Sequence, residues 1–414
     1  MLSFRLGWRN LWRNSRRTTI TWIAVTLNTA VMILSYALMD GLMGQVLSNA
    51  TNQVVGEVQV HAPGYLAERN VYLTIPQPQA VLDRAHALSV PAASRSYGYG
   101  LLSHGSKSAG AQFWGVHPRE ELAAFDLGRN IAEGSYLPTT PPAQPQDASA
   151  AHPMVLGAKL ARSLHVAPGD EIVAVVQAMD GSLGSQLFSV RGILKLAGES
   201  IDRNAAIVLA ADFEALFVSG GAIHEIALNS RGRMTPEVLA QNLAPATANL
   251  DVRTWHKLLP ALSDMASLFD ASILIFALIF GLAAASGVLN TMLMSTFERI
   301  REFGVQKALG ATPWRILADV ASEAFLLACL GTLAGVVLAL PASLYLHYRG
   351  LDLSSVVSGF TAMGVAYDPV WHARVSLQVF VAPVLVMWVV CLVASLWPAV
   401  RAARIQPVTA MTHV

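Results

Sequence analysis

The chain has 414 residues, of which 54% are hydrophobic and 13% charged, and its mean hydropathy is +0.47. This composition, with about half the usual share of charge, excludes an ordinary soluble protein. The formal net charge of +1 gives no electrostatic footprint for nucleic acid, which we do not expect as a partner. Cys329 and Cys391 both lie inside apolar runs, so we expect two buried side chains and no disulfide framework.

Four stretches are long enough to cross about 30 Å of hydrocarbon at 1.5 Å per residue. They are residues 20–43, 272–295, 318–345 and 375–397, and none of them contains Lys or Arg. Basic residues precede the first stretch, as they do in a secretory signal. Its apolar core is longer than that of a signal, however, and no small-residue cleavage site closes it, so we interpret it as a retained membrane anchor.

Basic residues near the ends of these stretches predict the orientation, because Lys and Arg favour the cytoplasmic side. They precede the first stretch, separate the second from the third, and follow the fourth: Arg5, Arg9, Arg13, Arg16 and Arg17; Arg299, Arg301, Lys307 and Arg315; Arg401 and Arg404. The opposite short loop, 346–374, has only Arg349 and Arg374. We therefore expect segments 1–19, 296–317 and 398–414 in the cytoplasm, and 44–271 outside it.

Segment 44–271 is large enough to be a folded domain, and its short apolar runs between turn signals predict an α+β fold. The expected strands are 172–176, 187–194, 205–209 and 225–228, and Thr235 with Pro236 has the chemistry of a helix start. The proline-rich stretch 138–153 is expected to lack regular structure. A helix opening at Pro260 and running unbroken to Ser295 would be about 54 Å long. The alternative is an ordinary linker followed by a span.

The segment 297–316, FERIREFGVQKALGATPWRI, has the pattern of a short amphipathic helix. Apolar Ile300, Phe303 and Leu309 recur at helical spacing. The other face carries polar residues, namely Glu298, Arg299, Arg301, Glu302 and Gln306. Gly310 permits a left-handed stop, and Thr312 with Pro313 restarts a helix. Glu298 and Glu302 can pair with Arg299 or Arg301, but recognition of a partner is the use we expect. The helix could instead lie on the membrane surface.

Small and polar residues inside the spans predict helix packing. Gly331 and Gly335 form a G-x-x-x-G step in the third span, and Gly281 is a small residue on the surface of the second span. Small residues let helices approach closely, which suits packing within one subunit or against a second copy. Asn290 is the candidate for an interhelical hydrogen bond. Glu323 either faces protein or extends its carboxylate to the membrane surface.

Catalytic and nucleotide-binding motifs are not found in the sequence. There is no H-E-x-x-H, G-x-S-x-G or C-x-x-C, so no catalytic or metal-binding residues are predicted and the chain is not expected to be an enzyme by itself. No G-x-x-x-x-G-K-(S/T) phosphate loop occurs either. The run from His104 to Ser108, HGSKS, lacks its first glycine.

Three segments together resemble the FtsX/MacB-type permease family. Residues 298–311, ERIREFGVQKALGA, are similar to the signature that lies between the second and third spans of that family. At the carboxyl end, residues 397–408, WPAVRAARIQPV, are similar to its P-A-x-R-A-A-(R/K)-x-x-P-(V/I) tail, and residues 8–18 resemble its amphipathic start. These matches lie in both ends and the middle of the chain.

The resemblance implies a membrane all-α bundle of four transmembrane helices with an α+β periplasmic domain inserted between the first and second spans. It also implies a place in the bacterial inner membrane and an ABC transporter of the mechanotransmission kind, in which two permeases, identical or related, each dock a separate ATPase. ATP and magnesium would be bound by that partner and no cofactor by this chain. The coupling helix of the family would correspond here to Glu298, Arg299, Arg301, Glu302, Phe303, Gly304, Lys307, Ala308, Leu309, Gly310 and Ala311.

Three roles are compatible with this family. Residues 56–65, GEVQVHAPGY, look similar to the LolC/LolE-like branch, which implies release of lipoproteins to a periplasmic chaperone. A MacB-like role implies export of drugs or peptides with an adaptor and an outer-membrane duct, although MacB carries its ATPase fused at its amino end. An FtsX-like role implies switching of an external hydrolase, but that branch usually has a much smaller external domain.

Overall fold

The computed structural model describes residues 8–9, 13, 15–139, 151–195, 197–355, 360–362, 365–367 and 369–405. The chain divides into two compact units. One comprises Met1–Gly44, Ala266–Leu353 and Val370–Val414, and it is helical. The other comprises Gln45–Met265 and Ser354–Pro369, and it contains the large sheet.

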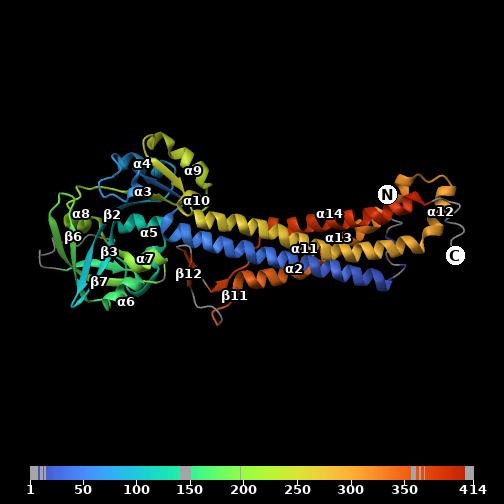
Figure 1. Ribbon diagram of the computed structural model, residues 1–414, viewed down its shortest axis with the longest axis horizontal. Helices are drawn as coiled ribbons and strands as arrows, with labels where there is room; N and C mark the ends of the chain where they lie inside the picture. The colour runs from blue at the N-terminus through green and yellow to red at the C-terminus, as the bar shows by residue number, and fades with distance from the viewer. Residues whose placement is uncertain are drawn as a thin grey trace. The chain divides into compact units, whose positions relative to one another are not determined.

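Four long helices form the helical unit and run alongside one another (Figure 1): α2 (Ser15–Ala50), α11 (Pro260–Glu298), α13 (Pro313–Arg349) and α14 (Leu377–Arg404). All four are long and apolar enough to cross a membrane, judged by length and composition. The predicted spans fall inside them, except that α14 begins two residues after the expected start at 375. The start of α11 at Pro260 agrees with the prediction, and the helix continues unbroken to Glu298.

The core of the helical unit takes side chains from all four long helices. Val25, Val288, Leu327 and Met387 are buried together, one from each helix. Large apolar side chains also cover the outside of the bundle; Leu333, for example, is 64% exposed. Exposed apolar surface of this kind suits hydrocarbon rather than water as the surrounding medium.

The second unit is built on a ten-stranded sheet with the order β10-β1-β9-β2-β3-β8-β5-β7-β4, while β6 pairs with β2 and β7. The strands are β1 (Val58–His61), β2 (Ala92–His104), β3 (Lys107–Val116), β4 (Ile131–Gly134), β5 (His152–Leu156), β6 (Glu171–Gln177), β7 (Leu183–Leu194), β8 (Ala205–Leu209), β9 (Glu225–Leu228) and β10 (Asp251–Thr254). Pairs β3–β8 and β5–β7 are parallel, and the other pairs are antiparallel. The sheet is therefore mixed and joins segments far apart in the chain.

Short helices cover this sheet and complete the unit (Figure 1). They are η2 (Thr51–Val55), α3 (Tyr65–Glu68), α4 (Pro78–Ala87), α5 (Pro118–Ala124), η3 (Leu127–Arg129), α6 (Ala158–Leu164), α7 (Glu199–Asn204), α8 (Ala210–Phe217), α9 (Pro236–Leu243), η4 (Ala244–Ala246) and α10 (Trp255–Leu258). The remaining elements are α12 (Ile300–Ala308), β11 (Leu351–Asp352), β12 (Phe360–Ala362), β13 (Val365–Tyr367) and β14 (Val370–Trp371).

Two of the hydrophobic clusters within the second unit pack on different parts of the sheet. The larger one gathers Phe113, Phe188, Phe213 and other buried side chains of β3, β7 and α8. The other packs α4 and α9 against β1 and β9, with Val81 of α4 and Leu239 of α9 fully buried. The sheet thus has two lobes, one around β10-β1-β9 and one around β3-β8-β5-β7.

The expected strands 172–176, 187–194, 205–209 and 225–228 all lie in β6, β7, β8 and β9, and the Thr235 hydroxyl caps α9 by accepting the Val238 N–H. The expectation of no regular structure over 138–153 is wrong at its end, because Pro153 lies in β5. Its position near the strand start makes the missing N–H tolerable there. Residues 140–150 of that stretch lie outside the described residues. The β2–β3 hairpin was not predicted.

Candidate functional site

The segment between α11 and α13 folds as the short helix α12, as its amphipathic pattern predicts. Arg299, with φ −113°, breaks α11 from α12, and Gly310, with φ +94°, provides the left-handed turn after it. Thr312 then takes an extended conformation, and Pro313 is the first residue of α13. These local signals fix both ends of α12.

Phe303 anchors α12 to the bundle. Its side chain is 1% exposed and packs with Ile316 and Val320 of α13 and with Ala399 and Ala402 of α14. Burying a phenylalanine from water stabilises by about 1.5–3 kcal/mol. The neighbouring Gly304 is buried as well.

Lys307 ties α12 to the last turn of α14. Its Nζ donates to the carbonyl oxygens of Ala403, at 2.7 Å, and Ile405, at 2.8 Å. The final carbonyls of a helix have no partner within the helix and carry partial negative charge, so an ammonium group satisfies both needs. The end of α14 is thereby fixed to α12.

Acidic residues of this segment pair with arginines, two of which lie outside it. Glu298 accepts from Nη1 of Arg17 at 3.1 Å, and Glu302 accepts from Arg13 and, at 3.1 Å, from Nε of Arg299. Burial alone would raise the pKa of the Glu302 carboxyl, but the hydrogen bonds from Arg13 and Arg299 outweigh it and hold this pKa below its usual range. Sequence spacing predicted the Arg299 pair but not those with Arg13 and Arg17, which are distant along the chain.

Arg299 does not lie on an outward polar face, as was expected. It is 9% exposed, and its Nη1 lies 3.0 Å from Oε2 of Glu323 in α13, which also accepts from the Ser295 hydroxyl. Burial demands a partner for each of these charges. Glu323 therefore faces protein and does not extend to a membrane surface.

The exposed part of this region differs from the predicted polar face. We define the α12 face as Arg301, Val305, Leu309, Trp314 and Arg315, all of which are exposed. Leu309, assigned to the buried apolar stripe from its spacing, is 83% exposed because α12 ends at Ala308. Trp314 and Val305 were not singled out in the sequence, although apolar residues off the buried stripe of a short helix are a signal for such a surface. Ala308 and Gly310 are exposed beside this face, and Ala311 is half-buried.

Glycines in the spans lie where helices approach closely. A Cβ at Gly331 would lie 2.6 Å from Cγ1 of Val25, and one at Gly335 would lie 2.7 Å from Cβ of Thr29, both in α2. A Cβ at Gly281 would meet Val390 of α14 at 3.2 Å. These contacts lie within one chain.

Asn290 makes no described interhelical hydrogen bond and is exposed. A hydrogen bond between α2 and α11 is instead made by the next residue, Thr291, whose hydroxyl bonds with that of Thr21. A one-residue step along a helix turns the side chain by about 100°, which is why composition alone could not distinguish the two.

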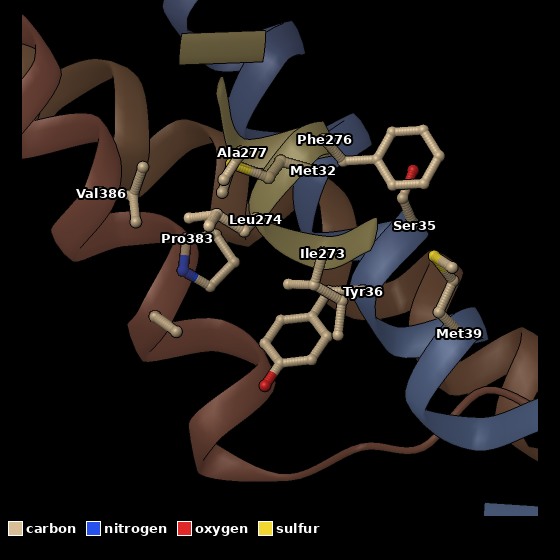
Figure 2. A pocket seen from close by; sticks show the side chains of 11 residues that line it. Met32, Ser35, Tyr36, Met39, Ile273, Leu274, Phe276, Ala277, Pro383 and Val386 are labelled. Carbon is tan, nitrogen blue, oxygen red and sulfur yellow. The ribbon is translucent and has the colours of Figure 1, made fainter. Parts of the chain in front are cut away.

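A small apolar cavity opens among the long helices. Its volume is about 200 Å³. Figure 2 shows Met32, Ser35, Tyr36 and Met39 of α2 around it, together with residues of α11 and Pro383 and Val386 of α14. Ser35 and Tyr36 supply the only polar side chains among the lining residues. The cavity therefore suits an apolar group.

In the second unit, a buried guanidinium joins three elements. The fully buried Arg95 of β2 donates from Nε and Nη2 to the two carboxylate oxygens of Glu121, at 3.1 and 2.6 Å, and from Nη1 to Glu225 at 2.8 Å. Tyr97 donates its hydroxyl to the same Glu225 oxygen at 3.0 Å. Every charge in this network is paired. We therefore assign it a structural role, in which it connects β2, α5 and β9.

Metal-binding groups of three or more His, Cys, Asp or Glu side chains are not found within the described ranges. The candidate functional features described so far are therefore the α12 face and the apolar cavity among the long helices.

Two family models match the chain. The MacB-like periplasmic core domain matches residues 18–246, more than half of the chain, and the FtsX-like permease C-terminal region matches residues 274–407. The chain belongs to the FtsX/MacB type of ABC transporter permease. Its four apolar helices and its membership of this family make it a multi-pass membrane protein.

Curated relatives include the pyoverdine export ATP-binding/permease protein PvdT of Pseudomonas fluorescens, 26% identical over 99% of this chain and 59% of the relative. The PvdT protein of Pseudomonas syringae is 25% identical with the same coverage. The uncharacterized ABC transporter permease YknZ of Bacillus subtilis is 31% identical over 32% of this chain and 28% of the relative. This chain thus spans about 59% of the length of the PvdT proteins.

Among solved structures, the extracellular domain of the transporter YknZ from Gram-positive bacteria matches with a TM-score of 0.33 and 11% identity, covering 48% of this chain and 98% of that domain. The periplasmic region of MacB from Actinobacillus actinomycetemcomitans matches with a TM-score of 0.33 and 15% identity, covering 50% of this chain and 92% of that region.

Proposed function

We propose that this chain is the permease subunit of an ATP-driven complex in the bacterial inner membrane, and that a separate ATPase docks on the α12 face. The observation that carries the proposal is the construction of α12: it is anchored to the bundle and still presents exposed apolar and cationic side chains. Leu309 and Trp314 are 83% and 77% exposed, and Arg301 and Arg315 of the same face are exposed cations. A short apolar patch with a charged rim is the usual anatomy of a protein interface.

The anchorage of α12 supports a mechanical role. Phe303 and Lys307 attach it to α13 and α14, and Glu302 attaches it to Arg13 before α2. The end of α11 is attached to α2 by the pair of Glu298 with Arg17. A displacement of α12 by a nucleotide-driven partner would therefore move these helices together. Since α11 is unbroken from Pro260 to Glu298, it can pass that displacement along its length.

The substrate that suits this role is amphiphilic. The apolar cavity among α2, α11 and α14 would take a hydrocarbon part, and the polar remainder would face the outside (Figure 2). Export is favoured by the PvdT relatives, which are named pyoverdine export proteins, and release of a lipoprotein by the resemblance of segment 56–65. A second permease copy, and an adaptor or chaperone outside the membrane, complete the proposed assembly.

The test uses the tagged chain purified from its own cells, with measurement of the ATPase that copurifies and of its ATP hydrolysis. Leu309→Asp combined with Trp314→Ala should reduce both by roughly tenfold, because two central interface side chains are removed. Leu183→Asp is the matched control, since Leu183 is 79% exposed but lies in β7 of the second unit. Equal recovery of the ATPase with both variants would refute docking on this face. Mass spectrometry of the copurified molecules would separate a lipoprotein from a small amphiphile.

A further inference from the structure

The second unit contains a cavity of about 660 Å³ between its two lobes. Its lining residues come from η2, β1, α3, β2, β3, α7, β9, β10 and α10 and from the residues beside them. Cavities of roughly 300–1,000 Å³ are the size that holds small organic molecules. Nothing in the ATP-coupling role described above uses this cavity.

Its charges are not balanced. Four cationic side chains line the cavity, Arg69, Arg95, Arg253 and Lys257, against two carboxylates, Glu225 and Asp251. The carboxylates are engaged: Glu225 with Arg95 at 2.8 Å, and Asp251 with Arg253 at 2.7 Å. Among the described residues, neither Arg69 nor Lys257 forms an ion pair with a carboxylate. Two positive charges are therefore left to attract an anion.

The remaining lining combines apolar and aromatic side chains with the polar Gln59, Gln112 and Ser200. Leu66, Ile201 and Leu259 line the cavity, and so do Tyr97 and Trp114, whose rings meet edge to face at 5.4 Å between centroids. Tyr97 and Trp114 are each 5% exposed, and they are held by the packing of β2 against β3. Apolar and polar side chains occur together in ligand pockets, where the charged groups fix the orientation of the ligand.

The backbone and a neighbouring ring also position Arg69. Arg69 ends α3 in the left-handed conformation, with φ 50°, and its guanidinium lies 5.8 Å from the centre of the Tyr65 ring. Tyr65 is 2% exposed, so its ring is a fixed platform for that guanidinium. A cation held in place loses less entropy when an anion binds than a freely rotating one.

We infer that this cavity binds a small organic anion, with its acidic group between Arg69 and Lys257 and its apolar body against Trp114 and Ile201. A metal ion does not suit the cavity because both carboxylates are already paired with arginines. The site is a property of the second unit and requires neither the docking of an ATPase on α12 nor the cavity among the helices.

The experiment titrates dansyl-glutamate, an acidic fluorophore with an apolar ring system, into the full chain held in phosphatidylcholine nanodiscs. Fluorescence anisotropy measures binding, with empty nanodiscs as the blank. The native chain should bind saturably. Arg69→Gln combined with Lys257→Gln should weaken binding by about tenfold or more, because two charge-assisted contacts are lost. The neutral dansyl-glycinamide should likewise bind about tenfold more weakly than dansyl-glutamate.

Two further variants keep the result interpretable. Lys107→Gln removes an exposed cation in β3 that does not line the cavity, and it should leave the affinity unchanged. Ala67→Trp adds bulk at a lining position without changing charge and should abolish binding. The inference is overturned if the native chain shows no saturable binding, or if the Arg69/Lys257 double variant binds as tightly as Lys107→Gln.

Discussion

Nη1 of Arg299 lies 3.0 Å from Oε2 of Glu323, which joins the break before α12 to a buried position of α13. The two side chains are 10% and 6% exposed, so neither charge has water to replace its partner. Removal of one member of a buried pair typically costs about 3–5 kcal/mol, whereas replacing both with apolar residues is often nearly neutral.

Glu323→Leu alone should therefore lower the apparent Tm of the purified protein more than Arg299→Met with Glu323→Leu together. The physical reason is that the single change removes the buried anion beside the Arg299 guanidinium and leaves it only the more exposed Glu302 as a partner. Thermal unfolding in one detergent measures both. Arg129→Met, which breaks the exposed pair with Asp126 at 3.5 Å, is the control and should change stability by less than about 1 kcal/mol. A double variant less stable than the single one would contradict the interpretation.

Because α13 approaches α2 closely, we expect two glycine-to-alanine variants to differ in stability. Gly335→Ala places a methyl group 2.7 Å from Cβ of Thr29 and 3.0 Å from the carbonyl oxygen of Thr26, so the helices must separate. Overpacking of this kind costs about 1–3 kcal/mol. Gly287→Ala in α11, where nothing lies within 4 Å of the added methyl group, should be neutral or stabilising. Apparent Tm values of the two variants, measured side by side, should differ in that order.

Acid should loosen the second unit through His224. The Nδ1 atom of His224 accepts the backbone N–H of Tyr97 at 3.0 Å, and its Nε2 donates to the Val71 carbonyl at 2.8 Å, so the ring is neutral in the fold. Burial lowers the pKa of His224 below its unfolded value of 6.5. The unfolded chain therefore binds more protons, and the stabilising contribution, present above pH 6.5, falls as the pH drops from there toward the folded pKa.

Hydrogen exchange of residues 92–104 in the full chain, compared between pH 7.5 and pH 5.5 after correction for intrinsic rates, measures this effect. Protection should decrease at the lower pH in the native chain. In the His224→Asn variant, these residues should be less protected than in the native chain at pH 7.5, but their protection should decrease less on acidification. His86→Asn, at an exposed position of α4, should behave like the native chain. An identical pH response in the His224 variant would assign the effect to another group.

Sidedness can be tested with single cysteines. Leu309→Cys and Leu183→Cys are both highly exposed positions, whereas Cys329 and Cys391 lie in or beside the bundle core. A membrane-impermeant maleimide applied to spheroplasts should label the cysteine at 183, and the one at 309 only after lysis. Labelling of both without lysis would place α12 and the sheet in one compartment, and the proposed coupling could not operate.

Local signals in the sequence predicted a large part of this fold. The spans could be found because apolar runs of that length have few soluble alternatives, and the end of α12 because Gly310 permits a left-handed turn and Pro313 begins the next helix. Thr235 before Pro236 likewise predicted the start of α9. In each case, residues close in sequence determine the structure.

Contacts between distant residues could not be predicted in this way. Arg95 reads as an ordinary strand arginine until β2 is paired with β9, because its partners Glu121 and Glu225 are far along the chain. Arg299 was assigned to an exposed face because helical periodicity continues the α11 pattern through the break at that residue. The sheet order, in which β1 lies between β9 and β10, is equally non-local.

The two hydrogen bonds of Lys307 to the carbonyl oxygens of Ala403 and Ile405 make the last turn of α14 a supporting part of the loop between α11 and α13. A chain shortened at residue 402 would keep nearly all of its four apolar helices and still lose both acceptors. Fusion tags and truncations at this end should therefore be judged by whether they preserve those two carbonyl groups, and not by whether they spare the hydrophobic segments.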